Sequence, residues 1–284
     1  MRRVRVLVVS LLVFVLAVFG LAACGGSGGS SGSSSAKAEP ANAADVFKAY
    51  SAGNADNYTV NGAMAYKINA SGSGMTLEMP INIKWDNFDF AGKYSHGKLS
   101  MSMEAMGQSE NMNAEMYMDL SGSKPVVYSS EDGTTWTKNA DSSMGDVQQF
   151  LPTFADSTSA ELFAKSEFSK TDSGYTVKVK MKDWMDNTST KEMFSQLSSA
   201  MGQSADTEAL EKAMEGCSVT YTFDKDCNLT KLQMDEFTYE TTVNTAGTSM
   251  NMKIGMSIDC DYSNFGKIDE SKVKAPESVV SAAK

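Results

Sequence analysis

Long stretches of this chain alternate strictly between apolar and polar residues. From residue 75 to 85, and again from 250 to 262, every second side chain is apolar and most of those between are polar. A two-residue repeat places the apolar side chains on one face of a β-strand, because successive side chains point to opposite faces. One apolar and one wet face are typical of an antiparallel sheet. The same repeat predicts further strands at residues 58–70, 99–105, 112–120, 125–130, 134–138, 174–184, 218–223 and 229–244.

Irregularities in the pattern predict how the strands bend and connect. In the range 229–244 the apolar positions change parity between Met234 and Phe237, which predicts a β-bulge near Asp235 and Glu236. Hairpin connections are predicted where Gly, Asp and Ser gather between strands, at residues 72–74, 131–133, 224–226 and 246–247.

A 3.6-residue repeat indicates a few amphipathic helices. They are predicted at residues 42–55, 144–154 and 189–201, the last continuing to 214, with a short helix opened by Thr158 and Glu161. About ten strands with one apolar face need a cover, which these helices can supply. The predicted fold class is therefore α+β, a strongly curved, mostly antiparallel sheet of about ten strands with helices covering its concave apolar face.

The N-terminus has the organisation of an export signal. Three arginines precede an apolar run over residues 6–21, and Leu21-Ala22-Ala23-Cys24 follows. This tetrapeptide resembles the lipobox of bacterial lipoproteins, which implies cleavage before Cys24, thioether lipidation of its sulfur and acylation of its new amino group. A transmembrane anchor is the alternative, but the apolar run is short for a span of about 20 residues. The predicted division is a signal peptide at 1–23, a lipidated, Gly/Ser-rich tether at 24–41 and one domain at 42–284.

The charge balance limits the partners. The chain has 35 acidic and 25 basic residues and a net charge of -10. Nucleic-acid binding requires clustered Lys and Arg, so no nucleic-acid partner is predicted. An acidic domain does not favour an anionic bilayer either, and the predicted link to the extracytoplasmic face of the cell membrane is the lipid on Cys24 alone.

Three cysteines remain after lipidation, in a compartment where disulfides are permitted. Their odd number leaves at least one thiol free. If the hairpin turns at residues 224–226, Cys217 lies opposite a residue near 233 and cannot meet Cys227 within the ladder. A Cys227–Cys260 disulfide is the weakly favoured pairing.

The order of elements resembles the half-barrel lipoproteins of the LolA, LolB and LppX type. The most similar pieces are the hairpin from Val127 to Lys138, which contains Trp136, the closing Tyr262-Ser263-Asn264-Phe265 and the later Ala275-Pro276-Glu277. The resemblance covers residues 42–278 and implies a hydrophobic cavity that carries a lipid or a lipoprotein acyl chain. Because this chain keeps its own anchor, binding or handing over lipid at the membrane surface is expected instead of shuttling.

Methionine is unusually frequent, with 20 in 284 residues. Ordinary core packing, an adaptable lining for acyl chains and a Cu(I) site are the three interpretations. Copper is the least favoured, since the Met-x-Met pairs at 101–103, 116–118 and 250–252 follow the inward face of strands and do not converge. The predicted cavity lining is Met79, Ile81, Met101, Met103, Met116, Met118, Phe194, Leu197, Met252 and Ile254.

Catalytic chemistry has little support in the sequence. The one histidine, His96, lies in Tyr94-Ser95-His96-Gly97-Lys98 and is interpreted as part of a solvated turn. No Cys-x-x-Cys, phosphate-binding loop or His-Glu-x-x-His motif occurs. Asp224, Asp226 and Asn228 resemble the opening of a calcium loop, but Leu229 stands where such a loop needs glycine, so a hairpin turn is preferred.

No enzyme, cofactor or metal site is therefore predicted. The sequence favours an anchored lipoprotein that binds a lipid or other apolar ligand in a sheet–helix cavity, with lipid transfer as an extension. The alternative is a structural or sensory envelope protein with a filled core that binds an unidentified protein partner.

Overall fold

The computed structural model describes residues 39–53, 56–72, 75–105, 108–122, 126–139, 163–185, 212–245 and 248–283. The predicted signal peptide, Cys24, most of the tether and the helices predicted at 144–154 and 189–201 lie outside these ranges. Within them, no helix combines the length and apolar character that a membrane span requires.

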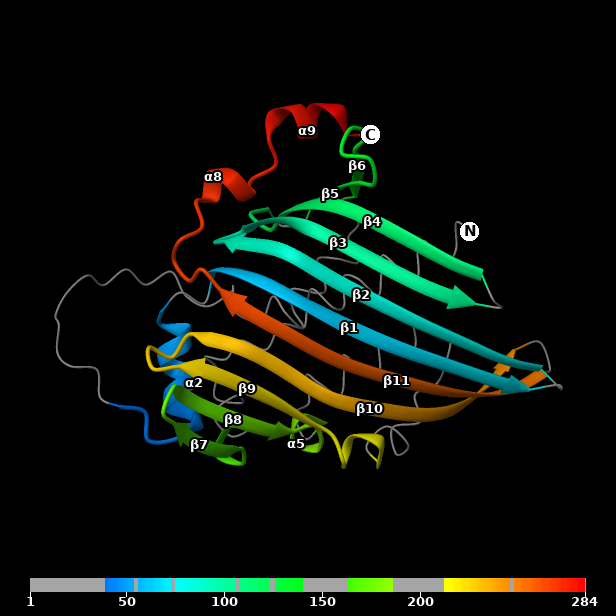
Figure 1. Cartoon of the computed structure of the whole chain (residues 1–284), viewed down its shortest axis with the longest axis horizontal. Helices are drawn as coiled ribbons and strands as arrows, with labels where there is room; N and C mark the ends of the chain where they lie inside the picture. Colours follow the sequence, from blue (N-terminus) through cyan, green and yellow to red (C-terminus); the bar gives the residue numbers. More distant parts are fainter. Residues whose placement is uncertain are drawn as a thin grey trace.

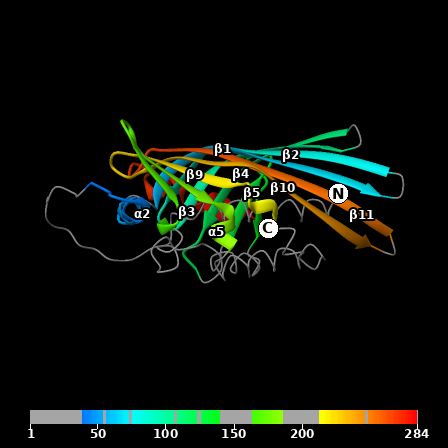
Figure 2. The same cartoon turned by 90° about the horizontal axis from the view of Figure 1, so that it is seen from below.

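A single open sheet of eleven antiparallel strands organises the described chain (Figure 1). The spatial order is β6-β5-β4-β3-β2-β1-β11-β10-β9-β8-β7, so two meanders meet at the centre, where the first strand pairs with the last. Figure 2 shows a curved sheet whose longest strands extend far beyond α2. The strands are β1 (Asn57–Gly72), β2 (Met75–Ala91), β3 (Tyr94–Ala105), β4 (Gln108–Asp119), β5 (Val126–Ser130), β6 (Thr137–Asn139), β7 (Glu167–Thr171), β8 (Gly174–Lys180), β9 (Ser218–Asp224), β10 (Leu229–Thr245) and β11 (Thr248–Ser263).

This architecture confirms the mostly antiparallel sheet predicted from the alternation. The strand β7 was not predicted, because its short polar sequence carries only one large apolar residue, Phe168. The strand predicted at 174–184 ends earlier, at Lys180, where the short helix α5 (Met181–Met185) begins.

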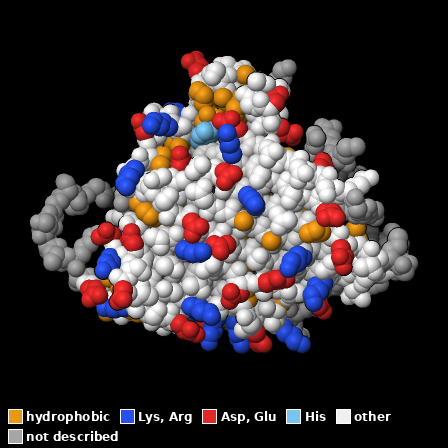
Figure 3. Space-filling view, viewed as in Figure 1, with side chains coloured by type: hydrophobic (Ala, Val, Ile, Leu, Met, Phe, Trp, Pro, Cys, Tyr) orange, Lys and Arg blue, Asp and Glu red, His pale blue; other side chains and the backbone are white. Residues whose placement is uncertain are grey.

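The apolar positions of neighbouring strands align in transverse rows. Met64 of β1 pairs with Ile83 of β2 and with Ile258 of β11, so all three side chains lie on the same face. The alternating polar residues occupy the other face, called the wet face below. Figure 3 shows the wet face with acidic and basic side chains scattered across it.

Bulges keep the apolar rows in phase. The register of β10 shifts between Met234 and Phe237, which confirms the predicted bulge. A second bulge lies in β2, where Asn87 adopts a φ of 46° and restores Phe88 to the apolar face after Trp85. Asparagine tolerates this left-handed conformation better than most residues.

The helix α2 (Ala43–Ser51) covers one end of the apolar face. Asn42 caps it by accepting a hydrogen bond from the Asp45 N–H at 3.0 Å, which satisfies a free amide of the first turn. Phe47 stacks on Phe163 with ring centroids 3.8 Å apart and meets the edge of Tyr221 at 5.2 Å. The described residues do not show helices over the rest of this face.

The C-terminal segment lies on the wet face and was not predicted to be helical. Its helices α8 (Glu270–Val273) and α9 (Glu277–Ala282) lie near the β3–β6 side of the sheet (Figure 1). Asn57 holds its start through two 2.9 Å hydrogen bonds with the backbone of Ile268. Val279 of α9 packs with Tyr128 and Trp136 in a small second core.

Strands β3 and β4 correct the interpretation of His96. The histidine belongs to strand β3, not to a solvated turn. Its ring stacks on Tyr117 at 4.1 Å between centroids, and its Nε2 lies 2.8 Å from Glu115 Oε1. The turn signal of the neighbouring Gly97 was misleading, because this glycine makes room for the Phe88 ring.

Candidate functional site

The apolar face divides into two regions that differ in cover. In the region nearest α2, called the proximal half, large side chains from the central strands are almost completely buried. They include Tyr58, Met64, Ile83, Trp85, Phe88, Leu99, Tyr221, Phe223 and Cys260.

Beyond the row of Met64 the same face is less covered. Ile68 pairs with Met79 on one side and Ile254 on the other, and Ile254 pairs in turn with Tyr239. All four side chains are half-buried. We call the half-buried apolar residues of this region the distal strip: Ile68, Leu77, Met79, Met103, Tyr239, Met252, Ile254 and Met256.

The predicted lining residues fall into both regions. Met79, Met103, Met252 and Ile254 belong to the distal strip. Ile81 is buried in the row that adjoins it, opposite Met103.

The other predicted lining residues are not gathered there. Met101, Met116 and Met118 are buried, and the last two lie on β4 opposite Gly97 and Ser95, in the proximal half. Phe194 and Leu197 lie outside the described residues. The structure therefore brings together only part of the predicted set.

Sequence reasoning did not single out Tyr66, although it lies in the apolar repeat of β1. It pairs with Ile81 of β2 and Met256 of β11, at the boundary between the proximal half and the distal strip. Its side chain is 6% exposed, and its hydroxyl has no hydrogen-bond partner in the described structure. Burial raises the pKa of this phenol, so it stays protonated and able to donate a hydrogen bond.

A hollow of about 610 Å³ lies on the opposite, wet face. Its floor is β1, where the small Ala63 and Ala65 occupy outward positions. Lys84 of β2 stands on one side, and Asp259 of β11 and Gln233 of β10 stand on the other. A volume of this size is in the range of ligand sites, but its lining is an even mixture of polar and apolar surface, and it lies on the face opposite to the predicted lipid cavity.

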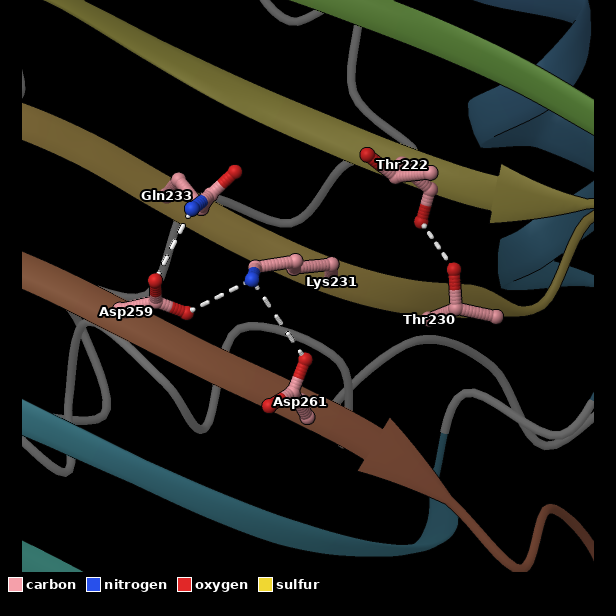
Figure 4. Close-up of polar contacts among 6 residues, drawn as sticks. All are labelled: Thr222, Thr230, Lys231, Gln233, Asp259 and Asp261. Atoms are coloured by element: carbon pink, nitrogen blue, oxygen red, sulfur yellow. Dashed lines mark hydrogen bonds and ion pairs between the residues drawn. The ribbon is translucent and has the colours of Figure 1, made fainter. Parts of the chain in front are cut away.

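A polar network stiffens the wall of this hollow (Figure 4). Lys231 Nζ lies 3.3 Å from Asp259 Oδ1 and 3.9 Å from Asp261 Oδ1. Gln233 donates a 2.9 Å hydrogen bond to the other oxygen of Asp259. These groups are exposed to solvent, so the network orients side chains more than it stabilises the fold.

The cysteines do not form the predicted disulfide. Cys260 has a free thiol and packs over Gly62, where any β-carbon would collide with its sulfur. Cys227 lies in the turn before β10, whereas Cys260 pairs with Leu232 further along that strand. Cys217 donates a hydrogen bond to the Asp235 carbonyl at 3.5 Å, and burial raises its pKa to about 11. Burial also raises the pKa of Cys260, so the thiols of Cys217 and Cys260 are protonated at neutral pH, which disfavours nucleophilic chemistry.

The segment that resembles a calcium loop is a hydrogen-bonded turn. Asp224 Oδ1 accepts from the N–H groups of Asp226 and Asn228 at 2.9 and 2.8 Å, and its Oδ2 accepts from the Asn228 side chain at 2.9 Å. Both carboxylate oxygens therefore serve the turn itself. Across the described ranges, no group of three His, Cys, Asp or Glu side chains is arranged to hold a metal ion.

Comparison with known proteins gives a family and no activity. No curated protein matches the chain. A family model described as "Family of unknown function (DUF6612)" matches residues 43–284, which is nearly all of the predicted domain and the whole described sheet. The chain belongs to this family.

Proposed function

We propose that this protein is a lipoprotein, anchored to the extracytoplasmic face of the cell membrane through Cys24, whose distal strip binds the acyl chain of a lipid. The observation that carries the proposal is the distal strip itself. It is an apolar surface of half-buried side chains, interrupted by the buried Ala70, beside a well-packed core in the same strands. Apolar side chains left partly uncovered beside a packed core are a common feature of binding sites.

The chemistry of the distal strip suits a variable hydrocarbon. Four of its members are methionines, Met79, Met103, Met252 and Met256. The thioether side chain is unbranched and polarizable, so it adapts to chains of different shape. Burying the remaining exposed part of a half-buried side chain of this size under a ligand contributes about 1 kcal/mol or less, a fraction of the roughly 1.5–3 kcal/mol for full burial.

The resemblance to half-barrel lipoproteins supplies the remaining parts of the proposal. The proposal places the helix predicted at residues 189–201 against the sheet, so that its Phe194 and Leu197 line the second wall of the cavity. The Gly/Ser-rich tether keeps the domain within about 20 Å of the membrane, since a flexible chain of its length reaches about that far. Lipid is then taken from, or delivered to, the surface to which the protein is anchored.

Lipid-dependent stability tests the proposal. The full-length protein, delipidated in detergent, is titrated with phosphatidylglycerol while its melting temperature is measured. A ligand that binds only the folded state at about 100 times its Kd stabilises it by about 2.7 kcal/mol. Ile254→Asn should abolish the rise in melting temperature, because it places an amide in the distal strip. Lys253→Asn is the matched control, since the adjacent side chain lies on the wet face.

Two results would overturn this proposal. One is a wild-type melting temperature that does not change with lipid. The other is an equal response from the Ile254→Asn and Lys253→Asn variants, since binding would then not involve the distal strip.

The lipid anchor is tested separately. The Cys24→Ser protein should remain uncleaved or be released into the medium, and a mature, membrane-bound Cys24→Ser protein would exclude lipidation at this residue.

The wet-face hollow favours the alternative function, an envelope protein that presents this face to a protein partner. A photo-crosslinking residue at position 65 would lie in the hollow, whereas one at position 69 would lie on the same face of β1 outside it. The alternative expects a single crosslinked species from position 65 in intact cells and none from position 69. Equal labelling from both positions would contradict it.

A further inference from the structure

The hydroxyl of Tyr66 is a buried polar group without a partner on the apolar face. It is buried, and no described residue accepts or donates a hydrogen bond to it. A buried polar group that makes no hydrogen bond costs roughly 1–3 kcal/mol, so such groups are uncommon unless a ligand or water completes them. Phenylalanine would fill the same space without this cost.

The position of Tyr66 relates this hydroxyl to the distal strip. In its own transverse row, Ile81 and Phe237 are buried while Met103 and Met256 are half-buried. Every described apolar side chain in the next row is half-buried. Tyr66 therefore lies in the row where the packed core ends and the half-buried distal strip begins. From this row, β1 continues for another four residues to Ala70, about 13 Å at the usual rise per residue.

The charges on this face select the kind of group that the hydroxyl can bind. The described apolar-face positions of β1, β2, β3 and β11 include no Lys or Arg. The nearest charged residue in register is Glu110, which pairs with Met103 at the exposed margin of β4. A carboxylate placed beside Tyr66 would lack a counter-ion and would face a second carboxylate, which is costly in a desolvated site. A neutral acceptor such as an ester carbonyl avoids both costs.

We propose that Tyr66 donates a hydrogen bond to the ester carbonyl of a lipid whose acyl chain lies along the distal strip. This inference rests on the proposed lipid-binding function and adds its ligand class, an ester-linked acyl lipid and not a free fatty acid anion. The hydrogen bond fixes one end of the chain at the edge of the packed core. The methionines accept chains of different length and shape beyond it.

Competition between ester-linked and ether-linked lipids tests the role of this hydroxyl. The full-length protein in detergent is mixed with equal amounts of diacyl phosphatidylglycerol and its dialkyl ether analogue, which has the same head group but no carbonyl. Native mass spectrometry then gives the ratio of the two bound lipids. One neutral hydrogen bond predicts a preference for the ester of about three- to tenfold in wild type.

Tyr66→Phe should lower that ratio to about one while leaving the ether analogue bound as tightly as before. Tyr50→Phe is the matched control, because Tyr50 is also a buried tyrosine with an unpartnered hydroxyl but lies on α2, at the covered end of the sheet. It should keep the ester preference. Palmitate added as a third competitor should bind more weakly than either phospholipid at pH 8.

The outcomes separate the two proposals. If wild type binds ester and ether lipids equally, or if Tyr66→Phe keeps the preference, the role of Tyr66 is wrong and lipid binding stands. Tighter binding of palmitate than of the ester would refute the ligand class. If none of the three lipids binds to wild type, the proposed function fails, and the role of Tyr66 fails with it.

Discussion

The two ends of the apolar face are built from the same strands but are not covered alike. On β1, Tyr58 and Met64 are buried at 0 and 1% exposure, while Ile68 of the same alternating series is only half-buried. The proximal half is closed by α2, whose Phe47 and Tyr50 contact the strand aromatics. Alternation thus determines which face of a strand is apolar, whereas neighbours from elsewhere in the chain determine whether that face is closed.

The residue types of the two ends differ as well. The proximal half is rich in paired rings, such as Tyr58 stacked on Phe90 at 4.9 Å and Phe47 stacked on Phe163 at 3.8 Å. The distal strip contains one aromatic residue, Tyr239, among Met, Ile and Leu. Rings in fixed contact make a rigid core, while methionines accept several arrangements. The contrast suits a domain with a stable end and an adaptable end.

Truncating one isoleucine in each region should give the largest difference in unfolding free energy between the proximal half and the distal strip. Ile83→Ala removes a completely buried side chain from the proximal half and should cost about 2–5 kcal/mol of unfolding free energy, because it leaves a cavity. Ile254→Ala in the distal strip should cost less, about 1–2 kcal/mol, since part of its side chain is already exposed. Urea unfolding of both variants measures the difference. Equal costs would show that the distal strip is ordinary core.

Gly97, which makes room for Phe88, offers a second way to destabilise the proximal half. A β-carbon at Gly97 would come within 2.5–2.7 Å of Phe88 atoms, including its Cα, so Gly97→Ala should destabilise the fold by about 1–3 kcal/mol. Gly216→Ala is the control, because a β-carbon there meets nothing within 4 Å. Thermal unfolding of both variants checks the expectation, and similar melting temperatures would mean that Phe88 moves without cost.

Alkaline pH should destabilise both ends of the apolar face, because buried acids with raised pKa values lie in each: Tyr221 and Tyr262 in the proximal half, and Cys217 beyond the row of Met64. Burial raises the pKa of Tyr221 and Tyr262, and raises that of Cys217 from 9.0 to about 11. The folded state therefore prefers the protonated forms, and stability present below pH 9 should fall as pH rises toward 11. Unfolding midpoints across this window measure the slope. Cys217→Ala should make the slope shallower, and an unchanged slope would exclude this thiol as a cause.

The smallest effects are expected on the wet face, at both ends alike. Lys231→Met near the hollow and Lys253→Met opposite Glu240 remove exposed ion pairs of 3.3 and 3.0 Å. Each should change the unfolding free energy by about 1 kcal/mol or less, because exposed pairs are screened by water and salt. Urea unfolding at low and high salt provides the measurement. A large difference between the two variants would mean that the proximal half and the distal strip differ in stability on the wet face as well as on the apolar face.

Local sequence patterns were sufficient for most of the sheet. The bulge at Asp235 and Glu236 follows from the parity change around it, and the turn at Asp224 follows from its Asx chemistry. A similar parity change between Trp85 and Phe88 marks the bulge of β2, but the predicted strand ended at residue 85, before that signal. These features can be predicted from the sequence because they depend on residues a few positions apart.

The candidate site depended much more on distant residues. That Tyr66 would lie between Ile81 and Met256, with its hydroxyl unpartnered, requires the pairing of β1 with the last strand of the chain. Likewise, His96 resembles a turn residue beside Gly97 until β4 supplies Tyr117 and Glu115. No local pattern contains these contacts, because they join residues that are far apart in the sequence.

Side-chain alternation and turn chemistry thus determine the strands, their apolar face and most of their connections from the residues alone. The order of the strands, the cover over the proximal half and the partial burial of the distal strip are decided only in the assembled structure. The physical reason is that burial is a property of what packs against a surface. A repeat of two residues specifies a face of the sheet, but it contains no information about its cover.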